Sequence, residues 1–250
     1  MFFFGKANYR DWTEEAHMFR LLKRRKKNLL RDLGPLFHEY SFFGVDNDQL
    51  PGYYELNQKA KAPIIIAYIA YAIAKSKQSA SDAVSFTELF CADGYYAMVA
   101  SRLGCDRSIG IDNDRDRHFS NAKVIANRLN INVDFRNDDI TPHSTFPSTD
   151  IVANVGGLYH VSEPERILQL SYKMANRFLI VQSLVSLARD EEDYFESPAP
   201  GWNWGSRFGR KSFDKMIKRT CPKILDCHFN ELEGNERLED RGSVYYLIEK

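Results

Sequence analysis

The sequence predicts an α/β protein built on a doubly wound, seven-stranded, mostly parallel sheet, and three observations lead to this fold class. After about residue 84, short apolar runs alternate with helical patterns, which is the order of parallel strands with helices on both faces of the sheet. A charged loop instead of a helix joins the last two apolar runs, so we expect an antiparallel C-terminal edge. Before residue 80 the pattern is helical. We therefore expect a helical extension or cap over 1–80 and a main domain over 81–250.

The composition excludes several classes of protein. The 34 basic and 34 acidic side chains of the 250 residues cancel, so the whole molecule has no field that would attract nucleic acid or an anionic membrane. The four cysteines form no C-x-x-C pair and have no histidine run beside them, so we expect neither a metal site nor a disulfide scaffold. The longest apolar run, 63–74, is shorter than the roughly 20 residues of a membrane span, and the first residues do not resemble a signal peptide. We expect a cytoplasmic protein, and the composition does not predict its oligomeric state.

The first expected element is a two-faced helix from about residue 12 to 33, which Gly34 and Pro35 end. Its leucines face one side, and a basic stripe lies on the other side: Arg20, Lys23, Arg24, Lys27 and Arg31. Such a stripe is usually a solvated outer face. The alternative is a docking strip for the phosphates of RNA or of a phosphorylated substrate. The sequence leaves both interpretations open.

The remaining elements follow in order along the chain. A turn-rich connector over 44–54 precedes a buried helix that we expect to open at Pro63, with the proline in its first turn. Alternating strands and helices follow: strands over 84–90, 107–111, 132–135, 150–155 and 178–184, and helices over 97–103, 118–129 and 163–174. The chain ends with a helix over 212–219 and strands over 223–231 and 243–249.

Acidic residues follow three of the expected strands and predict a nucleotide site. Glu88 ends the first strand, in the stretch ELFCADGYY, and Tyr95 begins a helix whose free N–H groups can face a ligand. Asp112 ends the second strand at about the 20-residue spacing at which a carboxylate binds a ribose diol. Asp139, after the third strand, could receive an adenine amino group. Because parallel strands end at one edge of a sheet, these acids predict an adenosyl ligand without a 2′-phosphate.

The order of residues in the loop discriminates between cofactors. In dinucleotide folds the glycines follow the strand directly, whereas here an acidic residue comes first, which disfavours NAD. This order resembles the class I S-adenosylmethionine-dependent methyltransferases, whose first motif runs acidic-x-Gly-x-Gly-x-Gly. Glu88 and Gly94 match the motif, whereas Phe90 and Ala92 stand at its first two glycines. The resemblance implies a Rossmann-like methyltransferase fold with S-adenosylmethionine bound by Glu88, Phe90, Ala92, Asp93, Gly94, Asp112, Asn113, Asp138, Asp139 and Asn154.

A narrower resemblance covers about residues 50–220. The phrase GLYHV at 157–161, with LPGYYEL at 50–56 and GWNW at 201–204, is similar to the branch that contains the wobble-uridine tRNA carboxymethyltransferases. This resemblance implies a tRNA acceptor as one alternative. Whether the donor carries a methyl or a carboxymethyl group stays open.

The two missing glycines raise the question of whether the loop still binds a cofactor. Ala92 adds one methyl group, a small intrusion if its φ stays negative. Phe90 could turn its ring into the core while its backbone faces the ligand. We expect a working pocket, and the alternative is a binding module that keeps the fold without catalysis.

Methyl transfer to a hydroxyl is helped by a base, and an imidazole suits that role near neutral pH. His160 follows the fourth strand, so we expect it at the same edge as the base, with Tyr159 as its companion; the alternative is a histidine that caps a helix or forms part of the pocket wall. The long loop before residue 207 supplies candidate acceptor-binding residues. Trp202 and Trp204 are expected as a lid, Arg207 or Arg210 as an anion clamp, and Tyr53 and Tyr54 as the opposite wall. The alternative is a packed surface loop whose tryptophans fill a side pocket.

The predicted function is therefore methylation of an oxygen of a small, sugar-like or phosphorylated acceptor. Two alternatives remain: a tRNA wobble-uridine-type transferase that would use the basic stripe, and the binding module without catalysis. The chemistry is an in-line displacement that needs no metal.

Overall fold

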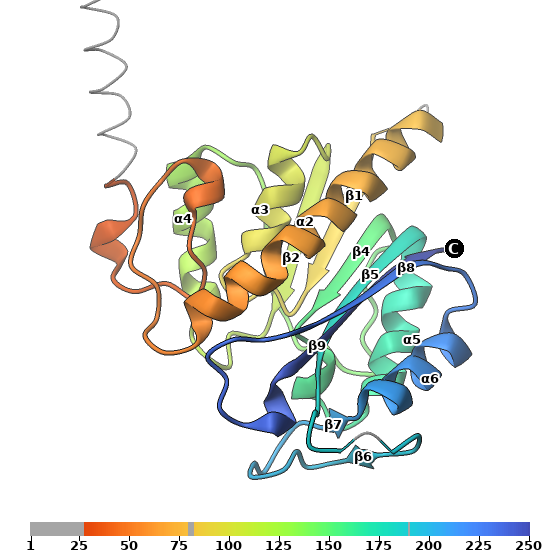
Figure 1. The fold of residues 1–250 in the computed structure, drawn as a ribbon. Helices are drawn as coiled ribbons and strands as arrows, with labels where there is room; N and C mark the ends of the chain where they lie inside the picture. The colour runs from red at the N-terminus through yellow and green to blue at the C-terminus, as the bar shows by residue number, and fades with distance from the viewer. Residues whose placement is uncertain (1–27, 80–82, 190) are drawn as a thin grey trace, which may run out of the picture.

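A computed structural model describes residues 28–79, 83–189 and 191–250, and its centre is a seven-stranded sheet (Figure 1). The strands lie in the order β3-β2-β1-β4-β5-β9-β8. Their bounds are β1 Ser85–Leu89, β2 Arg107–Asp112, β3 Asp134–Asn137, β4 Thr149–Val155, β5 Ala175–Val185, β8 Ile224–Glu231 and β9 Gly242–Glu249. The first five strands pair in parallel, and β9 is antiparallel to both of its neighbours. The predicted fold class, including the antiparallel C-terminal edge, is confirmed.

The antiparallel edge of the described sheet contains one reversed strand, β9, and not two. β9 pairs with β5 from Phe178↔Glu249 to Val185↔Gly242 and with β8 on its other side. Because β8 is antiparallel to β9, β8 runs in the same direction as β5. The helix α6, Arg210–Thr220, precedes β8 and makes this crossover possible. Only β9 therefore runs against the rest of the described sheet.

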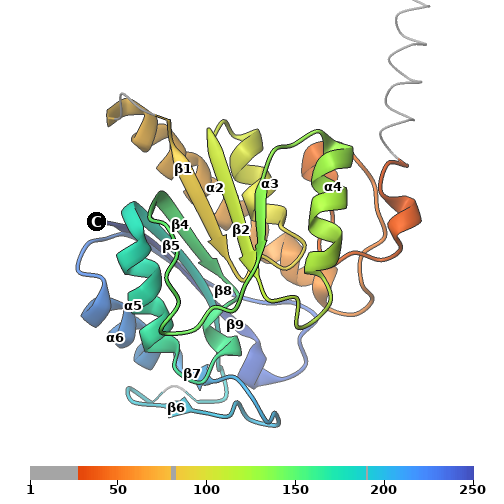
Figure 2. The same cartoon turned by 180° about the vertical axis from the view of Figure 1, so that it is seen from behind.

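Helices cover both faces of the sheet (Figures 1 and 2). One layer contains α2 Tyr54–Ser79, α3 Tyr95–Arg102 and α4 Ala122–Leu129, and its apolar side chains share one buried cluster with the sheet. The other layer contains α5 Pro164–Met174 and α6, which share a second cluster. Since α2 packs against β5 and β9, this part of the expected extension belongs to the helical layer of the sheet. No helix in the described ranges has the length and apolar content of a bilayer span.

The helix expected from Pro63 is longer than predicted. α2 begins at Tyr54, so Pro63 lies inside the helix and the expected connector ends at the start of α2. Proline removes one backbone hydrogen bond from a helix interior, but Pro63 is exposed, where water can satisfy the released carbonyl. The prediction that proline marks the first turn was wrong, because an exposed proline is tolerated inside a long helix that packs on its other side.

The basic stripe predicted on the first helix lies outside the described residues, except for Arg31. Arg31–Leu33 forms a short 3-10 turn that ends at Gly34, whose φ is 72°. Leu30 before it is fully buried in the first cluster. The RNA interpretation of the stripe therefore stays a prediction.

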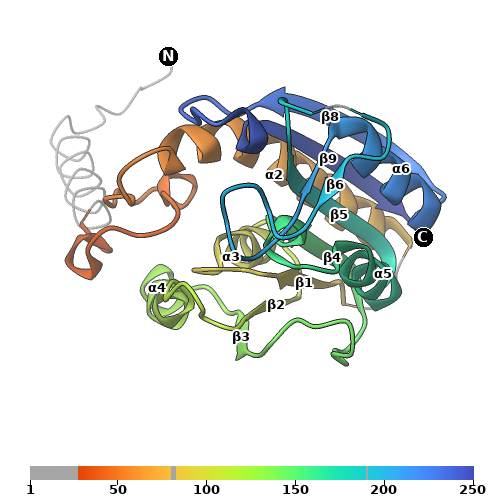
Figure 3. The same ribbon diagram turned by 90° about the horizontal axis from the view of Figure 1, so that it is seen from below.

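The parallel strands all end at one edge, which Figure 3 views end-on. The segment that joins β5 to α6 crosses this edge and includes the two-residue strands β6 Phe195–Glu196 and β7 Arg207–Phe208. The loop β1–α3 and the turn after β4 open at the same edge. A ligand site predicted at the strand tips therefore lies under a cover made by residues 191–209.

Candidate active site

The loop between β1 and α3 keeps the backbone shape of a glycine-rich turn although it contains one glycine. Phe90 has φ 58°, Ala92 has φ 48° and Gly94 has φ 81°. The condition under which Ala92 would be only a small intrusion, a negative φ, is not met. The left-handed region costs a non-glycine residue about 1–2 kcal/mol, and hydrogen bonds hold this turn: Gly94 N–H donates to Cys91 O at 2.7 Å and Ala92 N–H to Asp112 Oδ2 at 3.0 Å.

A glycine at position 92 should suit this turn as well as alanine does. We expect Ala92→Gly to leave the free energy of unfolding unchanged or to raise it by up to about 1 kcal/mol, because relief of the left-handed strain offsets the extra freedom of the unfolded chain. Ala97→Gly is the matched control, since Ala97 is buried in helix α3 and the change there should cost about 1 kcal/mol. Urea denaturation measures both. Equal losses for the two variants would show that the turn is not strained at position 92.

The ring of Phe90 packs against the backbone that follows β4. A Cβ placed on Gly157 would lie 2.0 Å from Phe90 Cδ2 and 2.6 Å from Asn154 Oδ1, so only glycine leaves room for this ring. Phe90 is half-buried and belongs to the edge of the second apolar cluster. The ring is therefore part of the wall of the cavity described next.

A cavity of about 520 Å³ opens at the carboxyl edge of the sheet, within the range of small-molecule sites. Glu88, Phe90 and Ala92 line it from β1 and its loop, and Asp112 and Asn113 line it from the end of β2. Other predicted residues that line it are Tyr53, Tyr54, Tyr159, His160, Trp202, Trp204 and Arg207. The structure therefore brings together residues that are up to 154 positions apart, from Tyr53 to Arg207.

Two carboxyl groups lie at the inner end of the cavity. Glu88 is 2% exposed, and its Oε2 accepts the N–H of Ala97 at 2.7 Å, while burial raises its pKa well above the ordinary value. Asp112 is half-buried and accepts Ala92 N–H through Oδ2 and Asp114 N–H through Oδ1. Burial also raises the pKa of Asp112. Each carboxylate oxygen has a second lone pair, so Asp112 can still accept a ligand hydroxyl.

Several predicted cofactor residues do not line the cavity. Asp138 and Asp139 are exposed, and Asp139 Oδ1 accepts the side-chain N–H of Asn113 at 2.7 Å. Asn154 is fully buried and donates to Ser171 Oγ. The cavity wall near the third strand is formed instead by apolar Ile140.

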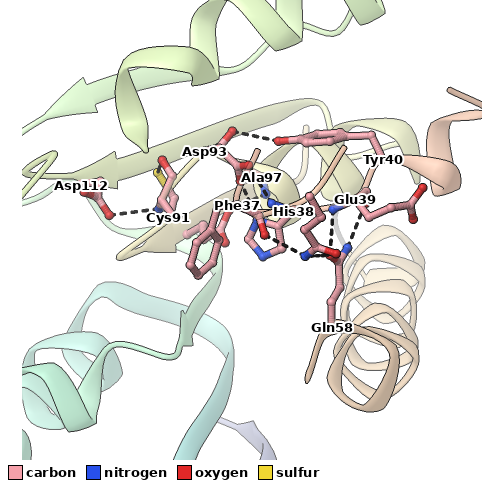
Figure 4. Close-up of polar contacts among 12 residues, drawn as sticks. Phe37, His38, Glu39, Tyr40, Gln58, Cys91, Asp93, Ala97 and Asp112 are labelled. Carbon is pink, nitrogen blue, oxygen red and sulfur yellow. Dashed lines mark hydrogen bonds and ion pairs between the residues drawn. The ribbon is translucent and has the colours of Figure 1, made fainter. Parts of the chain in front are cut away.

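Gly94 and Asp93 do not line the cavity and support the loop instead. A Cβ on Gly94 would lie 2.3 Å from Phe135 Cε1, and its φ also requires glycine. Asp93 is 1% exposed and bonds the backbone and the ring of His38 (Figure 4). Their placement gives both residues a role in holding the turn.

His160 and Trp204 form a stacked wall at the outer end of the cavity. His160 lies in the 3-10 turn Leu158–His160, and its ring stacks on Trp204 at 5.2 Å and 10°. The guanidinium of Arg115 lies 4.6 Å above the same indole, and its NH2 donates to His160 Nδ1 at 3.3 Å. His160 and Trp204 also line a second hollow of about 450 Å³. The predicted lid thus contacts the ends of both β2 and β4.

This arrangement makes His160 a poor base. Burial, and then the positive charge of Arg115, lowers the pKa of His160 to about 3. An arginine can only donate, so His160 Nδ1 accepts and the proton of the neutral ring lies on Nε2. His160 therefore offers an N–H to a ligand in the cavity and has no free lone pair for an acceptor proton.

The two arginines expected to bind an anion have other contacts. Arg207 is 4% exposed and forms an ion pair with Asp240 at 2.6 Å, below the ring of Tyr159 at 5.3 Å. Arg210 does not line the cavity, and its guanidinium lies 4.4 Å from the ring centre of Phe229. Burial raises the pKa of Tyr159 to about 12, so it stays a hydroxyl donor. The charge of Arg207 is largely neutralised by Asp240.

Lys61 is a cation of the cavity that sequence reasoning missed. It lies on α2 and lines the cavity with Asn57 and Gln58, and no carboxylate of the described residues forms an ion pair with it. Burial lowers the pKa of Lys61 to about 8. Residues 57, 58 and 61 share one face of a helix, and this spacing could have indicated a common polar surface. The expected helix start at residue 63 left these residues outside the predicted helix.

The sequence matches no family model and no curated protein. Its fold is similar to that of solved structures at low identity. The N-terminal domain of EvdMO1, crystallised with S-adenosylhomocysteine, has a TM-score of 0.57 at 16% identity and covers 92% of this chain and 96% of its own. The magnesium protoporphyrin IX methyltransferase ChlM from Synechocystis, with S-adenosylmethionine bound, has a TM-score of 0.57 at 12% identity, covering 90% of this chain and 96% of its own.

A third similar structure carries another activity on this fold. The [4+2]-cyclase SpnF has a TM-score of 0.54 at 15% identity and covers 73% of this chain and 80% of its own. Together these similarities show the Rossmann-like fold of the class I methyltransferases. At such identities they show the fold alone, so the activity has to be argued from the site.

Proposed function

We propose that this protein is an S-adenosylmethionine-dependent methyltransferase that acts on an oxygen of a small molecule. The observation that carries the proposal is the cavity at the strand tips, where Asp112 and the turn with three positive φ values meet. The turn keeps the shape in which backbone groups approach a ligand, although two glycines are replaced. The similar structures solved with S-adenosylmethionine or S-adenosylhomocysteine support the choice of cofactor.

In this proposal, each part of the cavity has a separate task. Asp112 would accept hydroxyl groups of the ribose, and Asn113 and Ile140 would line the place of the adenine. Bound S-adenosylmethionine supplies an electrophilic methyl group. Trp204, on which His160 stacks and over whose indole Arg115 lies, excludes water from the reacting end, and the His160 N–H orients the acceptor.

Sugar-like acceptors fit the cover of the cavity. Tyr53 and Tyr54 stack on each other at 5.0 Å, and Trp202 packs against Trp204 at 5.1 Å. Tyr53 and Trp202 are among the exposed large hydrophobic side chains, at 43% and 45%. Aromatic faces of this kind can cover a sugar ring, and a structure of EvdMO1 was determined in the presence of S-adenosylhomocysteine and D-fucose.

A binding module without catalysis is the second candidate, since Phe90 and Ala92 replace two glycines of the cofactor motif. Calorimetric titration with S-adenosylmethionine, S-adenosylhomocysteine and NAD tests both. We expect one site for each sulfur nucleotide and no heat with NAD. Absence of binding by both sulfur nucleotides would reject the proposal.

Lys61 predicts a pH dependence for the binding of an anionic group. With a pKa of about 8 its ammonium is charged below pH 8 and neutral above it. A ligand carboxylate or phosphate raises this pKa on binding, so affinity should be constant below pH 8 and fall by up to about tenfold per pH unit above it. Titration with S-adenosylhomocysteine at several pH values measures the effect. Lys61→Met is the control, because it removes the titration of Lys61 and keeps that of the ligand. The same dependence of affinity on pH in the wild type and in Lys61→Met would show that Lys61 does not bind the anionic group.

A further inference from the structure

His38 and Asp93 form a buried pair beside the cavity that the proposed site has not used (Figure 4). His38 is 8% exposed and Asp93 is 1% exposed. The distance from His38 Nδ1 to Asp93 Oδ1 is 2.5 Å, and the backbone N–H of His38 donates to Asp93 Oδ2 at 3.0 Å. Both carboxylate oxygens therefore face donors of the same residue, which fixes the position of the imidazole.

Neighbouring groups hold the pair in place. The His38 ring stacks on Tyr95 at 4.8 Å and 18°, and Tyr40 O–H donates to the carbonyl of Asp93 at 3.2 Å. The next residue along the chain is tied to α2, because Gln58 accepts Glu39 N–H at 2.8 Å and donates to Glu39 O at 2.9 Å. The segment that carries His38 is thus fixed on both sides, to the cofactor loop and to α2.

The pair determines which nitrogen of His38 carries the proton. A carboxylate accepts hydrogen bonds, so in the neutral ring Nδ1 is the protonated nitrogen and Nε2 carries the lone pair. No side chain or backbone group of the described residues bonds to Nε2. His38 lines the cavity and Asp93 does not, so the ring presents its free nitrogen on the cavity side.

We propose that His38 Nε2, oriented by Asp93, accepts the proton of the hydroxyl group that is methylated. The proposal rests on the proposed methyltransferase function. In this step the acceptor oxygen forms a bond to the methyl carbon while the carbon–sulfur bond breaks, and its electron pair stays on sulfur. The hydroxyl proton moves to Nε2, and the Asp93 carboxylate stabilises the resulting imidazolium until it releases the proton to solvent. The acceptor is therefore a hydroxyl compound that enters between the cofactor loop and α2.

Two of the histidines that line the cavity, His38 and His160, then have opposite tasks. His160 Nδ1 is bound by Arg115, so His160 donates through Nε2, whereas His38 Nδ1 donates to Asp93, so His38 accepts through Nε2. Tyr53 and Tyr54 line the cavity on the side of α2, where this acceptor would lie. The role first predicted for His160 is thereby assigned to His38.

The tautomer of His38 can be measured without knowledge of the acceptor. In protein with 15N-labelled histidine, saturated with S-adenosylhomocysteine at neutral pH, two-bond 1H–15N spectra should show His38 protonated on Nδ1 and unprotonated on Nε2. His38→Gln assigns the signals. The backbone N–H of His38 can only donate, so in Asp93→Asn it takes the amide oxygen as its acceptor. The amide N–H2 then faces Nδ1, which must accept, and the proton of the neutral ring moves to Nε2. Tyr40→Phe is the control that leaves the pair intact and should keep the wild-type tautomer.

Diethyl pyrocarbonate, which acylates an unprotonated imidazole nitrogen, is the second probe. We expect His38 of the wild type to react at least about tenfold faster than His38 of Asp93→Asn and faster than His160, as measured by peptide mass spectrometry. Protonation of Nε2 in the wild type, or equal reaction rates in both proteins, would overturn this inference. If the wild type does not bind S-adenosylhomocysteine, the proposed function fails instead, so the two failures are distinguishable.

Discussion

Replacing Asp112 by alanine should weaken the binding of S-adenosylhomocysteine by at least about 100-fold, because hydrogen bonds to a charged group contribute about 1.5–3 kcal/mol each and a ribose diol makes two. Asp112 also receives the N–H groups of Ala92 and Asp114, so its loss loosens the cofactor turn. Calorimetric titration at a temperature well below the unfolding transition measures the affinity. Asp112 is the acid at the end of β2 that lines the cavity, and it also accepts a hydrogen bond from the cofactor turn.

Two further variants separate ligand binding from general effects of lost charge. Asp134→Ala removes an exposed carboxylate of the neighbouring strand β3, whose partner is Arg136, and should leave the affinity unchanged. Asp112→Asn keeps the size and one acceptor oxygen, so it should bind more tightly than Asp112→Ala. Wild-type affinity in Asp112→Ala would place the ribose elsewhere.

Gly157→Ala should damage the same cavity from the other side. Gly157 has φ −85° and ψ −39°, which alanine adopts freely, so the effect of the added methyl is purely steric. That methyl would lie 2.0 Å from the ring of Phe90, and relief of the clash moves the ring toward the cavity. We expect a loss of stability of about 1–3 kcal/mol, as for other overpacked sites, and at least about tenfold weaker binding of S-adenosylhomocysteine.

The clash predicts that a second change rescues the first. In the double variant Phe90→Ala/Gly157→Ala the ring is absent, so binding and stability should recover in part, with a coupling energy of at least about 1 kcal/mol. Gly156→Ala is the control, because its φ is 75° but its nearest side-chain atom is 3.4 Å away, so it strains the backbone without moving a ring. Strict additivity of the Phe90 and Gly157 changes would contradict the described packing.

The sheet and its ligand-binding edge were predictable because they depend on local patterns. Alternating apolar runs place Glu88 and Asp112 at the ends of adjacent parallel strands, and parallel strands end at one edge. The same reasoning placed His160 at that edge. Its tautomer depends on Arg115, which lies 45 residues away in sequence, and no local pattern reports this contact.

Other parts of the site depend on tertiary contacts that the sequence does not display. Arg207 is neutralised by Asp240, which lies in the loop between β8 and β9, so the expected anion clamp has a partner already. His38 has no motif around it and reaches the cavity only because Asp93, 55 residues later, binds it. The positive φ of Ala92 is imposed by the hydrogen bond to Asp112 and by the packing of the turn, against the preference of alanine itself.

The fold alone does not decide the reaction, as the similarity to a [4+2]-cyclase shows. Methyl transfer is proposed because of the cavity, its carboxylates, and His38 and His160, whose Nε2 atoms offer a lone pair and an N–H respectively. Of the described histidines that line the cavity, His38 is the one whose ring is held by a buried carboxylate. The His38–Asp93 pair is thus the feature that favours catalysis over binding alone.

The most direct test of the central claim is a crystal structure of the protein with S-adenosylhomocysteine. We expect the ribose hydroxyls within about 2.5–3.0 Å of the Asp112 carboxylate, the adenine beside Ile140, and the sulfur inside the cavity that Phe90 lines. An S-adenosylhomocysteine molecule bound at another place, or a cavity still empty at a saturating concentration, would contradict it.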